Sequence, residues 1–281
     1  MPVPLSEALH DAATLAETKA RSVRSLPRYI VQSALAGAYV GIAVVLLLST
    51  AGPLAASDNP ATKLVAGSVF GIALTLVVFA GAELFTGNAM VMLQGWWARR
   101  VKASDVGNVW LASLAGNLMG SAAFATVVHG TGILTGAPSG TMLGKTIAAK
   151  VALTGPQLLW RSVLCNALVC LGLWMASRTK SEAAKLVVLW WALFAFIASG
   201  FEHSIANMTI FGLGVLNGTT TVAEMVRNLA WTLPGNVIGG GLVIGLGYAW
   251  IGGRRPSMVE PEPIVGAVTV DVDRRLAGVG R

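Results

Sequence analysis

The sequence predicts an all-α membrane protein with six transmembrane helices, arranged as an inverted three-plus-three repeat in which the second and fifth helices are broken. Three observations predict this fold class. Hydrophobic residues form 54% of the chain and charged residues only 12%, which leaves too little polar surface for a water-soluble domain. Six apolar stretches reach the length of about 20 residues that a membrane crossing needs. A sequence pattern also recurs at a fixed spacing.

The recurring pattern lies inside apolar sequence. Residues 81–88 (GAELFTGN) and 200–207 (GFEHSIAN) share a Gly, a Glu and an Asn at the same places, 119 residues apart (200 − 81). Residues 113–120 (SLAGNLMG) and 232–239 (TLPGNVIG) match at the same offset. Duplicated Gly and polar residues that interrupt hydrophobic runs indicate a transporter with broken helices at the membrane midplane.

The six predicted spans form one transport domain, residues 29–252. They lie near residues 29–51, 62–97, 106–130, 158–177, 185–216 and 226–251. The second and fifth are too long for one plain crossing, and they contain the two interruptions. Residues 1–28 show apolar residues at helical spacing, which predicts a cytoplasmic amphipathic helix. Residues 253–281 carry prolines and charges and are expected to form a flexible cytoplasmic tail.

The distribution of positive charge predicts cytoplasmic termini, because loops on the cytoplasmic side retain Lys and Arg. With the termini inside, 15 of the 20 basic residues lie on the cytoplasmic side. The net charge of +7 is then a signal of topology, and we expect no nucleic-acid partner. Three helices in each half make the second half enter the membrane from the opposite face.

Two broken helices that meet near the midplane present the N-termini of their second halves there. These ends offer unpaired N–H groups and the positive end of the helix dipole, which favour an anion. Irregular backbone at this depth persists only where protein or a water-lined cavity satisfies it. The sequence therefore predicts an anion pathway between the two breaks.

Polar residues at the breaks are the first candidates for the pathway. His203 is the only histidine placed deep in the membrane, so it is a functional candidate, with a structural hydrogen bond to the broken backbone as the alternative. Glu83 and Glu202 are expected to accept hydrogen bonds from free N–H groups of the following half-helix, with a proton relay as the alternative. Asn88 and Asn207 are expected to brace the loops.

Other candidates depend less on the repeat. Thr86 has Ile205 as its repeat partner, so the duplication does not require a hydroxyl there, and both a substrate contact and a local cap remain open. Lys150 lies in the third-to-fourth connection, where spacing alone predicts a solvated loop lysine. Large apolar residues that flank the breaks can form constrictions that gate by dewetting, or can simply pack. They are Phe70, Leu74, Leu84, Phe85 and Phe196.

Several other classes of protein fit the sequence poorly. A membrane anchor of a redox enzyme needs paired haem histidines or cysteine clusters, and the chain has neither, so we expect no cofactor, no metal and no enzymatic activity. Cys165 and Cys170 lie five apart on one predicted helix and are interpreted as packing residues. An aquaporin-like channel for neutral solutes is the alternative from a different class, but it needs two Asn-Pro-Ala motifs, and the chain has one, at residues 59–61.

Three segments resemble the formate/nitrite transporter family: FGIALTLVVFAGAELFTGN (70–88), CNALVCLGLWMASRT (165–179) and WWALFAFIASGFEHSIANMT (190–209). The last two resemble most of all its nitrite branch. The resemblance spans nearly the whole hydrophobic region. It implies an aquaporin-like fold and a homopentamer in a bacterial plasma membrane, with one substrate pore in each protomer.

The resemblance also implies which residues act on the substrate. The family's functional positions correspond to Thr86, Lys150, Asn166 and His203, and the apolar constrictions correspond to the five residues named above. Lys150 becomes an expected electrostatic attractor beside the pore. The implied substrate is a small monovalent anion, nitrite first, with formate or hydrosulfide as alternatives. Either the anion itself crosses, or it is protonated and crosses as the neutral acid with His203 exchanging the proton.

Overall fold

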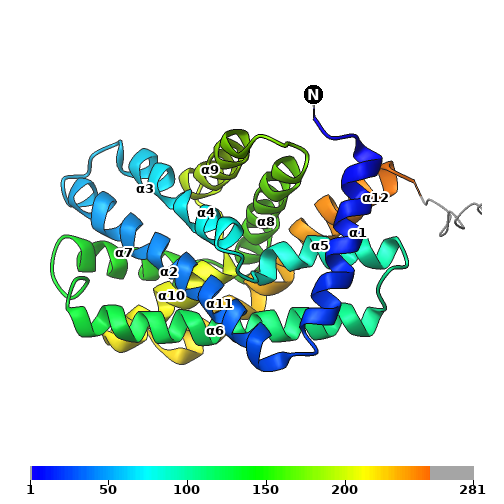
Figure 1. Cartoon of the computed structure of the whole chain (residues 1–281). Coiled ribbons are helices and arrows are strands. Elements are labelled where there is room, and N and C mark those ends of the chain that lie inside the picture. Colours follow the sequence, from blue (N-terminus) through cyan, green and yellow to red (C-terminus); the bar gives the residue numbers. More distant parts are fainter. Residues whose placement is uncertain (1, 254–281) are drawn as a thin grey trace, which may run out of the picture.

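The protein is described by a computed structural model, in which residues 2–253 are placed and are entirely helical outside the loops (Figure 1). The predicted tail lies outside the described residues from position 254 onward. The helices are α1 (Leu5–Ser22), α2 (Leu26–Ala56), α3 (Thr62–Phe70), α4 (Ile72–Phe79), α5 (Phe85–Trp97), α6 (Ala103–Thr131), α7 (Ser139–Val151), α8 (Gly155–Ser177), α9 (Glu182–Ala198), α10 (Ser204–Leu216), α11 (Val222–Asn236), the π-helix η1 (Val237–Leu246) and α12 (Gly247–Ile251).

Five stretches of the described chain are long and apolar enough to cross a membrane. They are Leu26–Ala56, Thr62–Phe79, Ala103–Thr131, Gly155–Ser177 and Val222–Ile251. The predicted fifth span is divided between α9 and the short apolar α10, so neither half reaches that length. The inverted relation of the two halves in a membrane stays a prediction.

Both broken helices are interrupted where the sequence predicted. α4 ends at Phe79 and α5 begins at Phe85, while α9 ends at Ala198 and α10 begins at Ser204. Gly81 and Gly200 both have φ of +73°, a left-handed conformation that is costly for residues with a Cβ. The repeated glycine therefore allows the chain to leave the helix at each break.

Close helix contacts also recur at corresponding places. α2 packs along α6, and α8 packs along α11 and η1. A Cβ on Gly120 would lie 1.8 Å from the carbonyl oxygen of Ala34, and one on Gly239 would lie 1.9 Å from that of Val163. Only glycine permits so close an approach, so the glycines of the second repeated pattern set the distance between these helices.

Two local features differ from the sequence-based expectation. The third-to-fourth connection contains the helix α7, and Lys150 lies in its last turn, not on a solvated loop. The last predicted span is not a uniform α-helix, because η1 inserts ten residues of π-helix between α11 and α12. Four of these ten residues are buried glycines, and they let the widened helix pack closely against α5 and α8.

The N-terminal helix α1 lies against α5 and is fastened at its two ends (Figure 1). Near its start, the Val3 N–H donates to the carbonyl oxygen of Arg178 at 2.8 Å, and Arg178 Nε donates back to the Val3 carbonyl at 3.0 Å. Near its end, Lys19 reaches the first helix break. α1 is therefore fixed to the helical body through both backbone and side-chain contacts.

Candidate functional site

A buried asparagine organises each helix break. At the first break, the Asn117 side chain accepts a hydrogen bond from the Phe85 N–H at 2.9 Å, which satisfies the first free donor of α5. The Asn117 amide donates to the carbonyl oxygens of Ser33 at 2.8 Å and Glu83 at 2.9 Å. One side chain from α6 thus joins α2, the break and the new half-helix.

The second break has the same arrangement. Asn236 accepts from the Ser204 N–H at 2.9 Å and donates to the carbonyl oxygens of Ser162 at 2.8 Å and Glu202 at 3.1 Å. Sequence reasoning did not single out Asn117 or Asn236 as site residues. The signal that would have found them was their own recurrence at the 119-residue offset.

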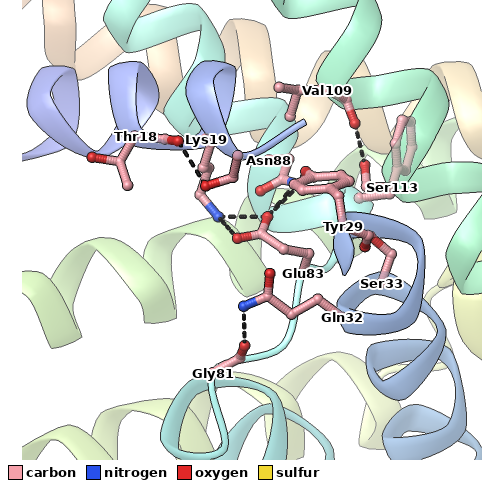
Figure 2. A network of polar contacts seen from close by, with 12 residues as sticks. Thr18, Lys19, Tyr29, Gln32, Ser33, Gly81, Glu83, Asn88, Val109 and Ser113 are labelled. Carbon is pink, nitrogen blue, oxygen red and sulfur yellow. Dashed lines mark hydrogen bonds and ion pairs between the residues drawn. The ribbon is translucent and has the colours of Figure 1, made fainter. Parts of the chain in front are cut away.

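The carboxylate of Glu83 does not accept from the backbone N–H groups of α5, so that expectation was wrong. Both its oxygens accept from Lys19 Nζ at 2.7 Å, and Oε2 also accepts from the Tyr29 hydroxyl at 3.1 Å and from Asn88 Nδ2 at 3.0 Å (Figure 2). The expectation failed because Asn117 already occupies the backbone donor. Glu83 instead holds α1 and α2 against the first break.

Glu202 is held in the same way. Its two oxygens accept from Lys150 Nζ at 2.9 Å each, and Oε2 accepts from Asn207 Nδ2 at 2.8 Å. The side chains of Lys150 and Glu202 are 13% and 4% exposed, so the predicted solvated lysine is an ion-paired residue at the second break. Each break therefore has one lysine, one carboxylate and one asparagine amide.

His203 is the N-cap residue of α10 and connects the two breaks. Its Nδ1 accepts from the Ala206 N–H at 3.2 Å, and its Nε2 lies 3.2 Å from Thr86 Oγ1. Because Nδ1 is an acceptor, the neutral ring carries its proton on Nε2, which donates to Thr86. Leu84 is the N-cap residue of α5 and occupies the corresponding place 119 residues earlier, so the imidazole is a feature of the second copy alone.

Two side chains of α8 hold the backbone at Thr86 through hydrogen bonds. The Thr86 carbonyl accepts from Asn166 Nδ2 at 3.1 Å and from the Cys170 thiol at 3.3 Å. Asn166 also donates to the carbonyl oxygen of Asn236 at 2.6 Å. Both donor contacts of the Asn166 Nδ2 are thus with backbone, and its Oδ1 accepts from the Cys170 thiol at 3.7 Å. Cys170 therefore contributes hydrogen bonds as well as packing.

A small cavity lies between the two breaks, and His203 contributes its polar surface. Its walls come from α2, α3, α4, α8 and α9 as well as both breaks, and they are Val40, Phe70, Ala73, Leu74, Leu84, Val169, Leu193, Phe196 and His203. Among these lining residues of the described chain, all but His203 are apolar. The site is therefore a small apolar cavity with one imidazole in its wall.

Four of the five predicted constriction residues line this cavity. Phe70 and Phe196 meet edge to face with ring centroids 5.6 Å apart, and Phe196 stacks on His203 at 5.8 Å. Phe85 does not line the cavity but packs against Trp110, with centroids 6.4 Å apart.

Sequence reasoning missed Val40, Ala73, Val169 and Leu193 as lining residues. Leu193 follows Leu74 by 119 residues, so the repeat offset carried the signal for at least this pair. Within residues 2–253, no group of three or more His, Cys, Asp and Glu side chains is arranged to hold a metal ion.

The family model "Formate/nitrite transporter" matches residues 6–250 of the chain. The nitrite transporter NirC of Escherichia coli (strain K12) is 41% identical over 241 residues, which cover 84% of this chain and 88% of that protein. A solved structure titled "FNT family ion channel" has a TM-score of 0.82 at 37% identity and covers 87% of this chain and 98% of its own. Another, "Pentameric formate channel with formate bound", has a TM-score of 0.71 at 27% identity, covering 82% and 98%.

Proposed function

Because the chain belongs to the formate/nitrite transporter family, we propose that it moves a small monovalent anion, nitrite, across a cell membrane and is not an enzyme. The similarity to NirC supports nitrite, and the pentameric relative with bound formate keeps formate as the alternative. Hydrosulfide is a further alternative. The proposed location is a bacterial plasma membrane, with both termini cytoplasmic.

One observation carries the proposal: His203 is the single polar side chain among the residues that line the apolar passage. A bare anion loses its hydration when it enters such a passage, and this is expensive unless a donor or a proton compensates. The Nε2–H of His203 can donate to a small anion in the cavity when it gives up its contact with Thr86.

The charges at the two breaks support an approach path for anions. Lys19 and Lys150 lie at the first and second breaks, and the N-termini of α5 and α10 add positive dipole ends. We propose that this potential draws the anion toward the cavity from either side. The carboxylates of Glu83 and Glu202 hold the lysines in place and moderate their charge.

We further propose that the substrate takes up a proton near His203 and passes the apolar constrictions as the neutral acid. Phe70, Phe196, Leu74 and Leu84 supply the apolar walls for this step. His203 has no free ring nitrogen, so a second proton on its ring displaces the contact between Nδ1 and Ala206. A protonated ring is then short-lived and ready to transfer its proton to the anion.

Flux measurements on purified protein in liposomes test this function. We expect nitrite, formate and hydrosulfide to enter proteoliposomes faster than empty liposomes, with nitrite fastest. Ala73→Leu should block the cavity and reduce flux at least tenfold. Val78→Leu, on the same helix but at an exposed position, is the matched control and should leave flux unchanged. Equal rates with and without protein, or a passage insensitive to Ala73→Leu, would contradict the proposal.

A further inference from the structure

At each helix break a lysine, a carboxylate and an asparagine amide form an anchor, and the two anchors differ in the groups that complete them. The first anchor is Lys19, Glu83 and Asn88, and the second is Lys150, Glu202 and Asn207. In the first break, the Tyr29 hydroxyl lies between two groups of the anchor, donating to Glu83 Oε2 at 3.1 Å and accepting from Asn88 Nδ2 at 3.1 Å (Figure 2). The nearby Ser113 hydroxyl donates to the carbonyl oxygen of Val109 at 2.7 Å (Figure 2). A hydroxyl group thus completes the first anchor.

The second break has no side-chain hydroxyl from the corresponding position. The Glu83 N–H donates to the carbonyl oxygen of Gln32, and the Glu202 N–H donates to that of Arg161. This correspondence relates α2 to α8 by 129 residues (161 − 32), which places Leu158 where Tyr29 stands. Leu158 is completely buried and offers no polar atom.

Two polar residues of α11 mark the face of this helix that meets Asn207. Asn228 and Thr232 follow Val109 and Ser113 by 119 residues, and they lie one helical turn apart on the same face of α11. Asn207 Nδ2 donates to Asn228 Oδ1 at 2.8 Å, which brings α10 and α11 together at this face.

Three polar atoms of this cluster are left without a hydrogen bond. They are Asn207 Oδ1, Asn228 Nδ2 and Thr232 Oγ1, and within residues 2–253 none has a partner. The three side chains belong to residues that are at most 2% exposed, so bulk solvent does not satisfy them. Buried polar groups are rarely left unpaired in a folded protein.

We propose that one buried water molecule binds between Asn207, Asn228 and Thr232, in the part of the second break where no hydroxyl corresponds to that of Tyr29. The chemistry of the three atoms selects water over other small ligands. Asn207 Oδ1 needs a donor, Asn228 Nδ2 needs an acceptor, and Thr232 Oγ1 takes either role. Nitrite and formate have no donor for Asn207, and a metal cation cannot accept from Asn228, whereas a water molecule does both and typically makes three hydrogen bonds.

The proposal gives the two anchors different properties. Glu83 accepts from a hydroxyl that is covalently attached to α2, whereas the amide oxygen of Asn207 depends on an exchangeable molecule.

A pair of isosteric substitutions tests the site through stability. Thr232→Val removes a hydroxyl that holds the water, and we expect it to lower the thermal midpoint of the intact oligomer by several degrees. Thr209→Val is the matched control. Thr209 is equally buried and its hydroxyl is also unpaired, but it lies near Gly41 and the Phe124 ring, outside the cluster. Thr209→Val should leave the midpoint unchanged or raise it, because it removes an unpaired polar atom from apolar surroundings.

High-resolution cryo-electron microscopy of the same oligomer gives the second measurement. We expect a density peak within hydrogen-bond distance of all three atoms in the wild-type protein. The peak should be absent from the triple variant Leu158→Tyr, Asn228→Val, Thr232→Ser, which transplants the first anchor into the second. A wild-type map without the peak, or a Thr232→Val midpoint at or above that of the wild type, would overturn the proposal.

Discussion

His203 uses both ring nitrogens in structural contacts, and this fixes what protonation would do. With Nδ1 bound to the Ala206 N–H and Nε2 facing Thr86, the neutral tautomer satisfies every partner. A second proton, on Nδ1, makes that nitrogen a donor that faces the Ala206 N–H, so their hydrogen bond at the start of α10 is lost. A role in proton exchange therefore requires a transient change at the N-cap.

The first prediction concerns His203→Asn. Asparagine is a favourable N-cap residue, so α10 and the oligomer should persist. Without an ionisable ring in the passage, the dependence of nitrite flux on pH should flatten. The measurement is flux into proteoliposomes over a range of pH, normalised to the amount of folded oligomer. An unaltered pH profile with normal flux would refute proton exchange at His203 and favour simple anion conduction.

The second prediction compares two ion pairs of α1. Lys19 and Glu83 are each 13% exposed, whereas the Arg100 and Glu17 side chains are 40% and 27% exposed. Lys19→Met leaves a largely buried carboxylate without its cation and should cost about 3 kcal/mol. Arg100→Met should cost at most about 1 kcal/mol, because the pair is screened by solvent.

The two variants are compared by thermal unfolding at neutral pH. Arg100 holds the pKa of Glu17 below its usual value through their hydrogen bond. The stabilisation by this pair is therefore present above the ordinary carboxyl pKa and is lost only as the pH falls through the lowered one. The control pair, Arg100 and Glu17, is therefore intact at pH 7. Equal decreases in the free energy of unfolding for Lys19→Met and Arg100→Met would count against a structural role for Lys19.

Among the helices, η1 is the element whose geometry most directly supports the site. Its glycines allow Asn166 and Cys170 of α8 to reach the carbonyl oxygens beside them. A Cβ at Gly240 would lie 2.2 Å from Asn166 Nδ2 and 2.6 Å from Cys170 Sγ. Neither side chain can withdraw without losing its hydrogen bond to the Thr86 carbonyl.

The third prediction follows from this contact. Gly240→Ala should destabilise the protein by about 1–3 kcal/mol, as overpacking typically does, and should reduce nitrite flux because Thr86 is displaced. Gly247→Ala is the control, since a Cβ there meets no atom within 4 Å. Thermal unfolding and flux are measured for both variants. A Gly240→Ala protein as stable and as active as Gly247→Ala would show that η1 does not set the position of Thr86.

On the scale of the whole molecule, orientation in the membrane is the fourth prediction. The distribution of Lys and Arg predicts cytoplasmic termini, so the connection between α2 and α3 should face outward. A single cysteine at Ser57, in a background without Cys165 and Cys170, should react with an impermeant thiol reagent added outside intact cells. Labelling that requires opened cells would reverse the assignment.

The fifth prediction is a homopentamer. The single chain exposes large apolar side chains, including Leu111 at 69% and Trp250 at 73%, which lipid or neighbouring subunits must cover. A solved relative is described as a pentameric channel. Native mass spectrometry in mild detergents should give five copies per particle, and a consistent monomer or tetramer across detergents would argue against this assembly.

The sequence by itself determined the class of molecule and the places where two helices break. Hydropathy depends on composition within about 20 residues, and the 119-residue offset can be read directly from the order of the residues, so Gly81 and Gly200 were identified from the sequence. The same offset indicates that Glu83 and Asn88 at the first break correspond to Glu202 and Asn207 at the second, and that each pair has the same role.

Only the tertiary structure decided the partners of these residues. Lys19 meets Glu83 across 64 residues, Lys150 meets Glu202 across 52, and Thr86 meets His203 across 117. Local propensity carries no information about such contacts, because they depend on how whole helices pack. The same holds for Asn117 and Asn236: their side chains satisfy the half-helices from a neighbouring helix, and this is why the carboxylates are free to bind lysine.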